Sequence, residues 1–164
     1  MRSTRSHRQG GFAFLLVLIA VVMMSVTLAS AAQIVSIEQR RDRELELLSI
    51  GRQIRTAIQS YHDVALIGGV AQYPRSWEDL LNDHRIAGPV RHHLRKVFVD
   101  PMTGKTDWEL QRAGDFIVGV RSSSGNVPLK QSGFEGEELG YNGATSYRSW
   151  VFAPQGVPAA PQAR

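Results

Sequence analysis

The sequence predicts an α+β fold, in which one long N-terminal helix packs on a small antiparallel β-sheet cap. The first observation is that the chain from Phe12 to His62 contains no proline and only one glycine, Gly51. The second is that this stretch is apolar in its first part and amphipathic in its second. The third is that short apolar runs alternate with turn-forming residues after residue 62, which is typical of a few short strands.

The composition limits the classes of protein to which the chain can belong. Its 164 residues support one domain of ordinary size, and the lack of cysteine excludes disulfides, thiolate zinc sites and a cysteine nucleophile. The net charge is +4, but three arginines and no acidic residue lie within residues 1–11. The rest of the chain is almost neutral. We therefore expect no nucleic-acid partner.

Residues 12–32 predict a transmembrane helix, because they contain no charge and no proline. A run of roughly 20 apolar residues is long enough to cross a bilayer core. The arginines before the run predict a single-pass protein with a cytoplasmic N-terminus and an external C-terminal domain. A cleaved signal peptide is the alternative, because an A-x-A site allows a cut near Ala31. The apolar run is longer than is usual in such peptides.

Residues 33–62 predict the continuation of the same helix, because they are rich in Glu, Arg, Leu, Ile and Gln. Apolar residues recur there at three- and four-residue steps and form one stripe, made of Leu47, Ile50, Ile54, Ile58 and Tyr61. We expect a single helix over residues 12–62 that carries a globular cap on this stripe. A coiled-coil stalk is the alternative, although the stripe is short and irregular for a heptad repeat.

A short basic leader that ends in glycine, followed by phenylalanine and then by a long helix, resembles the type IV pilin-like family. The resemblance is greatest to the pseudopilins of type II secretion systems, and in particular to the major pseudopilin. It implies that a prepilin peptidase removes residues 1–11 by cutting between Gly11 and Phe12, and that Phe12 is then methylated. A glycine at the cut allows close approach of the backbone to the peptidase. The resemblance also implies assembly through the N-terminal helix, including Phe14, Leu16 and Leu18.

The chain departs from the family pattern at Leu16. Most members place a glutamate at this fifth position of the mature chain, where it is thought to pair with the N-terminal amine of the neighbouring subunit. Leucine cannot form this pair, so the new ammonium group at Phe12 needs another partner. The resemblance therefore leaves open whether the chain is a major, minor or tip subunit.

Residues 63–153 predict the cap, which begins with a short helix. Ser76 and Asp79 have the spacing of a capping box, and an apolar face follows, made of Trp77, Leu80 and Leu81. Residues 97–125 predict three strands with turns between them, and the first turn contains Asp100, Pro101 and Gly104. Residues 146–152 predict a closing strand with Tyr147, Ser149 and Val151 on one face and Arg148, Trp150 and Phe152 on the other. Residues 154–164 are rich in proline and alanine, which predicts a disordered tail.

Two parts of the cap contain residue types that can bind a metal ion. The stretch 133–143 contains three glutamates between glycines, Glu135, Glu137 and Glu138. Major pseudopilins use a loop in this region for calcium, so these glutamates are weak calcium candidates, although their spacing matches no EF-hand. His92 and His93 are adjacent and lack a second ligand pair, so we expect no metal site there. We otherwise expect no cofactor.

The basic stretch 91–96, RHHLRK, is interpreted as a solvated surface or as a contact for acidic partners or lipid headgroups. The serines of residues 121–125 have no nucleophile-elbow motif around them. No other motif carries chemistry, so we expect that the protein is not an enzyme.

These features predict a structural subunit of a type II secretion filament or a related type IV pilus in the bacterial inner membrane, with its C-terminal domain in the periplasm. Its expected partners are prepilin peptidase, other pseudopilin subunits, the inner-membrane platform of the secretion system and membrane lipid. The alternative is an exported or membrane-anchored periplasmic binding module with an ordinary signal peptide. The two hypotheses differ in the site of the cut.

Overall fold

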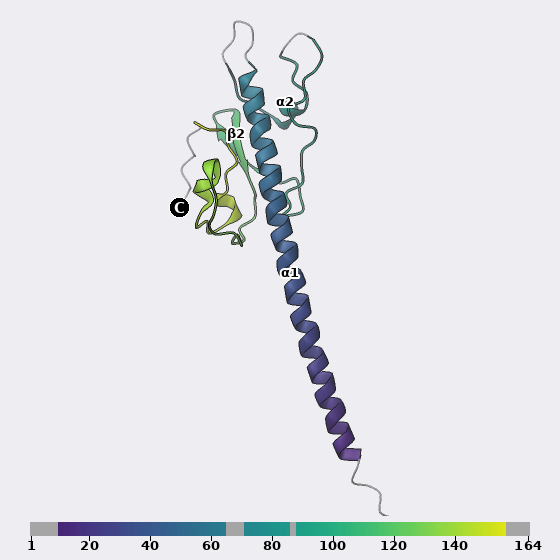
Figure 1. The fold of residues 1–164 in the computed structure, drawn as a ribbon. Helices are drawn as coiled ribbons and strands as arrows, with labels where there is room; N and C mark the ends of the chain where they lie inside the picture. The colour runs from purple at the N-terminus through teal and green to yellow at the C-terminus, as the bar shows by residue number, and fades with distance from the viewer. Residues whose placement is uncertain (1–9, 65–70, 86–87, 157–164) are drawn as a thin grey trace, which may run out of the picture. The chain divides into compact units, whose positions relative to one another are not determined.

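The computed structural model describes residues 10–64, 71–85 and 88–156, with the backbone alone at residues 10–11 and 26–35. Its regular elements are two α-helices, two β-strands and two short 3₁₀ helices. In chain order they are α1 (Gly10–Asp63), α2 (Trp77–Leu81), β1 (Glu109–Ala113), β2 (Phe116–Arg121), η1 (Gly136–Tyr141) and η2 (Tyr147–Ser149) (Figure 1). The described part of the chain is thus a mixed α+β structure with a two-stranded antiparallel sheet. The chain divides into two units, Met1–Arg41 and Asp42–Arg164.

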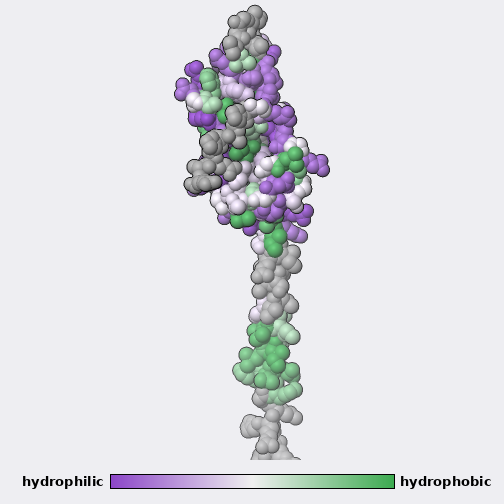
Figure 2. Space-filling view, turned by 90° about the vertical axis from the view of Figure 1, so that its left-hand side faces the viewer, coloured by the Kyte–Doolittle hydropathy of each residue, from purple (hydrophilic) through white to green (hydrophobic). Residues whose placement is uncertain are grey.

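Helix α1 covers the whole range over which the sequence predicts one helix, and it extends one residue further at its C-terminal end. In the first unit its side chains over residues 12–25 are exposed, and the large ones are apolar, which gives the continuous green stretch of Figure 2. Among the residues whose side chains are described, no helix is both long enough and apolar enough to cross a membrane.

The core of the second unit forms along the predicted stripe of α1. All five stripe residues are buried, and Ile54 and Ile58 have no exposed surface. They pack with Ile117 and Val120 of β2, which lies beside this part of the helix in Figure 1. The 3.6-residue period of an α-helix places these stripe residues on one face, and this face binds the cap.

Helix α2 begins as the sequence predicts. The backbone N–H of Asp79 donates to Ser76 Oγ at 3.3 Å, and the carboxylate of Asp79 accepts from the N–H of Ser76 at 3.0 Å. This capping box satisfies two N–H groups that the first turn of a helix cannot bond internally. Leu80 is fully buried, and Trp77 and Leu81 pack partly buried against the core, which confirms the predicted apolar face.

The sheet contains two of the three strands predicted over residues 97–125. Strands β1 and β2 form a hairpin around Gly114, whose φ of +61° is the left-handed conformation that a tight turn requires. The first predicted strand, residues 97–99, does not form, so this prediction is wrong. Only Asp100 is paired there, in a bridge to Lys105 across the predicted turn. The turn closes early because the buried Asp100 carboxylate accepts from the N–H of Met102 at 2.8 Å.

The prediction of a closing strand over residues 146–152 is also wrong. Residues 147–149 form the 3₁₀ helix η2, and only Phe152 pairs with the sheet, through Val120. The three-residue period of a 3₁₀ helix places Tyr147 and Trp150 on the same side. Tyr147, Trp150 and Phe152 are therefore all fully buried, whereas an extended strand would separate the first from the other two.

Two predicted segments lie mainly outside the described residues. For the leader 1–11, only residues 10–11 are described, and they are helical. For the predicted tail 154–164, only residues 154–156 are described. Pro154 is buried, so the chain packs on the cap at least as far as this residue.

Candidate functional site

The predicted processing and assembly residues lie at the start of α1. Gly11 and Phe12 are helical, and the exposed fractions of Phe12 and Phe14 are both 67%. Leu16 is 51% exposed and Leu18 is 47% exposed. Phe14 and Leu18 share a face because they are four residues apart, whereas Leu16 lies on a different face. A helix that is apolar all round is stable when apolar surroundings cover it, and a membrane or a bundle of similar helices provides such surroundings.

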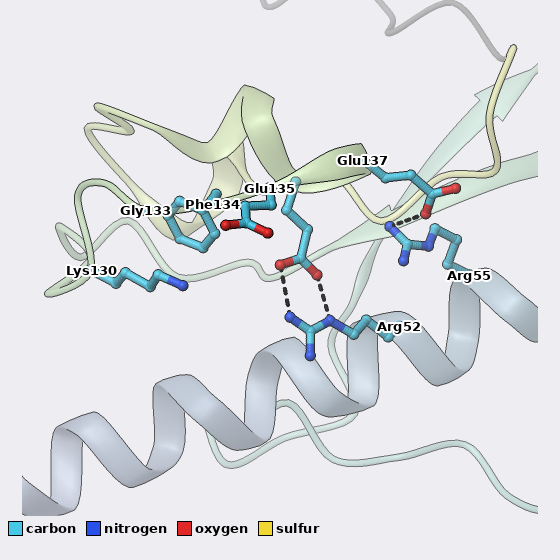
Figure 3. A pocket seen from close by; sticks show the side chains of 8 residues that line it. Arg52, Arg55, Lys130, Gly133, Phe134, Glu135 and Glu137 are labelled. Carbon is cyan, nitrogen blue, oxygen red and sulfur yellow. Dashed lines mark hydrogen bonds and ion pairs between the residues drawn. The ribbon is translucent and has the colours of Figure 1, made fainter.

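The three glutamates near the C-terminus do not form a common site. The Glu138 carboxylate is bound through both of its oxygens by Arg52 of α1, at 2.5 and 2.8 Å, and Glu137 pairs with Arg55 at 2.7 Å (Figure 3). Glu135 is exposed and is in neither pair. These hydrogen bonds from Arg52 lower the pKa of the Glu138 carboxyl. Within the described ranges, no three His, Asp or Glu side chains are placed to hold a metal ion.

The carboxylates of Glu137 and Glu138 in η1 are therefore paired with arginine side chains of α1. Arg52 and Arg55 are three residues apart, so both point from one face of α1 toward η1 across an open pocket of about 330 Å³ (Figure 3). The bidentate geometry at Arg52 fixes both the distance and the orientation of η1. Calcium would need six to eight oxygen ligands, and two of the three candidate carboxylates are already occupied by guanidinium groups.

The structure also assembles a polar network that the sequence analysis missed. Ser60 Oγ lies 2.9 Å from His93 Nδ1, and His93 Nε2 lies 3.2 Å from a carboxylate oxygen of Asp83. Arg85 donates to both oxygens of Asp83, at 2.9 and 2.8 Å, and to the carbonyl of Tyr61 at 2.7 Å. The side chains of Asp83 and His93 are almost completely buried. We call these four side chains, Ser60, Asp83, Arg85 and His93, the histidine network.

A serine bonded to a histidine that is bonded to an aspartate is also the arrangement of a nucleophilic catalytic triad. Two features of the histidine network differ from such a triad. Arg85 neutralises Asp83, so this carboxylate has less net charge with which to stabilise an imidazolium. Ser60 lies within α1, where its backbone N–H is bonded inside the helix, whereas an oxyanion hole needs free N–H groups. We therefore interpret the histidine network as a fixed connection between α1 and residues 83–93.

Asp83 makes the stability of this connection dependent on pH. Hydrogen bonds from Arg85 hold the pKa of the Asp83 carboxyl well below its ordinary range. A depressed pKa contributes stability that is complete above the ordinary pKa, about 3.9, and is lost as the pH falls below it. We expect Asp83→Asn to lower the free energy of unfolding by about 2 kcal/mol at neutral pH, because a charge-assisted pair is lost. Denaturation at a series of pH values measures this.

The difference between the wild type and Asp83→Asn is expected to shrink as the pH falls below about 4, because the unfolded wild type then takes up a proton at this carboxyl while the folded protein still holds it charged. Asp115→Asn is the matched control, because Asp115 is an exposed residue of the hairpin turn. It should change stability by less than about 0.5 kcal/mol. A difference that stays constant from neutral to acid pH would contradict the assignment to the Asp83 charge.

No protein-family model, curated protein sequence or solved structure matches the chain. The class of protein is therefore defined by the chain's own geometry. In the described residues, this is a small α+β unit built on the end of a long helix, and the first part of the same helix is exposed and apolar.

Proposed function

We propose that the protein is a pseudopilin-like structural subunit of a type II secretion filament or a related type IV pilus. Prepilin peptidase removes the leader, and the subunit assembles through the apolar start of its N-terminal helix. It is held in the bacterial inner membrane with its cap in the periplasm, and the filament serves protein export. The proposal rests mainly on one observation: the Gly11–Phe12 junction is followed directly by the exposed apolar side chains of residues 12–25.

Two further observations support this proposal. The first is that the apolar residues cover several faces of α1, so the helix can contact lipid and neighbouring helices at the same time. The second is that the cap is tied to the later part of the helix by buried apolar residues and by Arg52 and Arg55. A subunit that transmits force along a filament needs such a connection between its helix and its cap.

The departure at Leu16 gives this proposed subunit a distinct property. Residues 12–25 contain no carboxylate, so the ammonium group of a mature Phe12 has no partner within this part of its own sequence or of an identical neighbour. An uncompensated charge is costly in an apolar environment. The proposed subunit therefore needs a partner for this charge from outside residues 12–25.

The processing site tests the proposed function directly. We expect the mature protein from membranes to begin at a methylated Phe12 when prepilin peptidase is present, and at Met1 when it is absent. Intact mass and N-terminal sequencing measure this. Gly11→Val should block the cut because a branched side chain hinders access to the bond. Gly10→Val, one position earlier, is the matched control and should still be cut.

Two outcomes would overturn the proposed function. A chain that begins near Ala32 would establish an ordinary signal peptide and thus an exported binding module. A chain that begins at Met1 even in the presence of the peptidase would leave a protein that keeps its leader, and assembly through a processed N-terminus would be excluded.

A further inference from the structure

A second pocket of the cap lies between α1 and residues 92–98, and we call it the 92–98 groove. Its volume is about 470 Å³. One wall is a face of α1 with Gln53, Thr56 and Ser60, which follow each other at three- and four-residue steps. Buried Leu94 and half-buried Phe98 contribute apolar surface. The groove therefore combines apolar contact area with the exposed hydroxyl group of Thr56, which can bond a peptide backbone.

Hydrogen bonds hold the second wall of the 92–98 groove in place. The N–H groups of His93 and Leu94 both donate to the carbonyl of Leu80 at 2.9 Å. His93 also connects to Ser60 and Asp83 through the histidine network. These bonds fix residues 92–94 against α1 and α2 without any ligand. A groove formed in advance binds at a lower cost, because its side chains do not have to be ordered on association.

The rim of the 92–98 groove carries positive charge that the cap does not neutralise. Arg95 lines the groove, and the ammonium group of Lys96 lies 5.4 Å from the ring centroid of Phe98, which also lines it. Both cations are exposed, and the described part of the chain places no carboxylate in an ion pair with either. The nearby acids Asp83 and Glu138 are occupied by Arg85 and Arg52. Arg52 also lines the groove, but its guanidinium group is already bound by Glu138.

This positive charge is local. From Asp42 to its end, the chain contains as many acidic as basic residues. A surface for nucleic acid or for an anionic membrane would need a positive field over a much larger area. Two cations without a carboxylate partner, beside apolar side chains, instead suit a short ligand that carries both carboxylates and an apolar side chain. An acidic protein segment has this chemistry.

We propose that the 92–98 groove docks an extended acidic segment of a partner protein. Carboxylates of that segment pair with Arg95 and Lys96, and an apolar side chain of the segment packs on Leu94 and Phe98. The hydroxyl of Thr56, at an exposed position of the α1 wall, bonds its backbone. The proposal is independent of the processing site, because every residue that it uses belongs to the cap or to the part of α1 that packs with it.

The test uses the full chain in a non-ionic detergent and a fluorescent peptide of alternating Glu and Leu, with binding measured by anisotropy. We expect binding that weakens with added salt, and little binding of the matched peptides in which Gln or Lys replaces Glu. The double variant Arg95→Glu with Lys96→Glu should weaken binding by about tenfold or more, because two attractions become repulsions. Arg43→Glu with Lys105→Glu is the control, because it changes the same charge outside the groove.

A second variant tests the opposite wall. Thr56→Glu places a carboxylate in the groove at an exposed position of α1, and glutamate is a good helix former, so folding is preserved. It should weaken binding of the acidic peptide by several-fold. Thermal unfolding of each variant shows whether the cap is intact.

Four results would overturn the proposal. The first is that the wild type does not bind the acidic peptide, and the second is that the groove and control variants weaken binding equally. The third is that the groove variants affect only adsorption to phosphatidylserine vesicles, relative to phosphatidylcholine vesicles, which would assign the cations to lipid. The fourth is that they affect only self-association of the chain, which would assign the groove to a second copy.

Discussion

The variant Gly51→Ala is expected to lose about 3 kcal/mol or more of unfolding free energy, although alanine is the better helix former by about 1 kcal/mol. A Cβ at Gly51 would lie 2.3 to 2.4 Å from three ring carbons of Phe152. These distances are far below van der Waals contact, and Phe152 is fully buried, so its ring cannot move into solvent. Overpacking of this kind forces side chains or backbone to shift. Chemical denaturation measures the change in stability.

The control for Gly51→Ala is Ser49→Ala, at an exposed position of the same helix. There alanine should be neutral or slightly stabilising. The double variant Gly51→Ala with Phe152→Leu should lose less unfolding free energy than the sum of the two single losses, because the smaller side chain gives room for the new methyl group. If Gly51→Ala were as stable as the wild type, the close packing of Phe152 on α1 would be wrong.

We expect Glu44→Ala to be the other strongly destabilising change, at about 4 kcal/mol. Glu44 is only 3% exposed, and its carboxylate accepts hydrogen bonds from the N–H groups of Leu129 and Lys130, both at 2.8 Å. It also accepts from the hydroxyl of Tyr147 at 2.9 Å. Alanine would leave all three donors without this acceptor, and each buried unsatisfied group costs about 1–3 kcal/mol. Equilibrium unfolding measures the loss.

Glu46→Ala is the matched control for Glu44→Ala, since Glu46 is an exposed glutamate on the same helix. Its effect should stay below about 0.5 kcal/mol. A cycle with Tyr147→Phe tests the network itself, and the two changes should not be additive, because both remove the same hydrogen bond. Strict additivity, or equal losses for Glu44→Ala and Glu46→Ala, would contradict the role of the buried carboxylate.

Glu44 and Gly51 show why part of the fold could not be predicted from the sequence. In the sequence, Glu44 is one of several charged residues on an amphipathic helix, and nothing distinguishes it from Glu46. Its hydroxyl partner, Tyr147, is 103 residues away. Gly51 appears only as a weak point in a helix, whereas its function is to leave space for a phenylalanine near the other end of the cap.

The candidate sites likewise include features that the sequence predicts and features that it does not. The start of the long helix and its apolar residues could be recognised directly, because consecutive residues carry the whole pattern. The pairing of Glu137 and Glu138 with arginines could not, and in the sequence these glutamates are equally compatible with an ion. Ser60 and His93 are 33 residues apart, and each of them alone gives no signal.

Local sequence patterns were enough to predict the long helix, its apolar stripe, the capping box of α2 and the turn at Asp100, because these features depend on residues within a few positions of each other. Contacts between distant residues explain the rest: the absence of a strand at residues 97–99, the 3₁₀ conformation at residues 147–149, the partners of the buried acids and the 92–98 groove. These depend on which distant side chains compete for the same space and the same hydrogen bonds, and that competition is settled only when the chain folds.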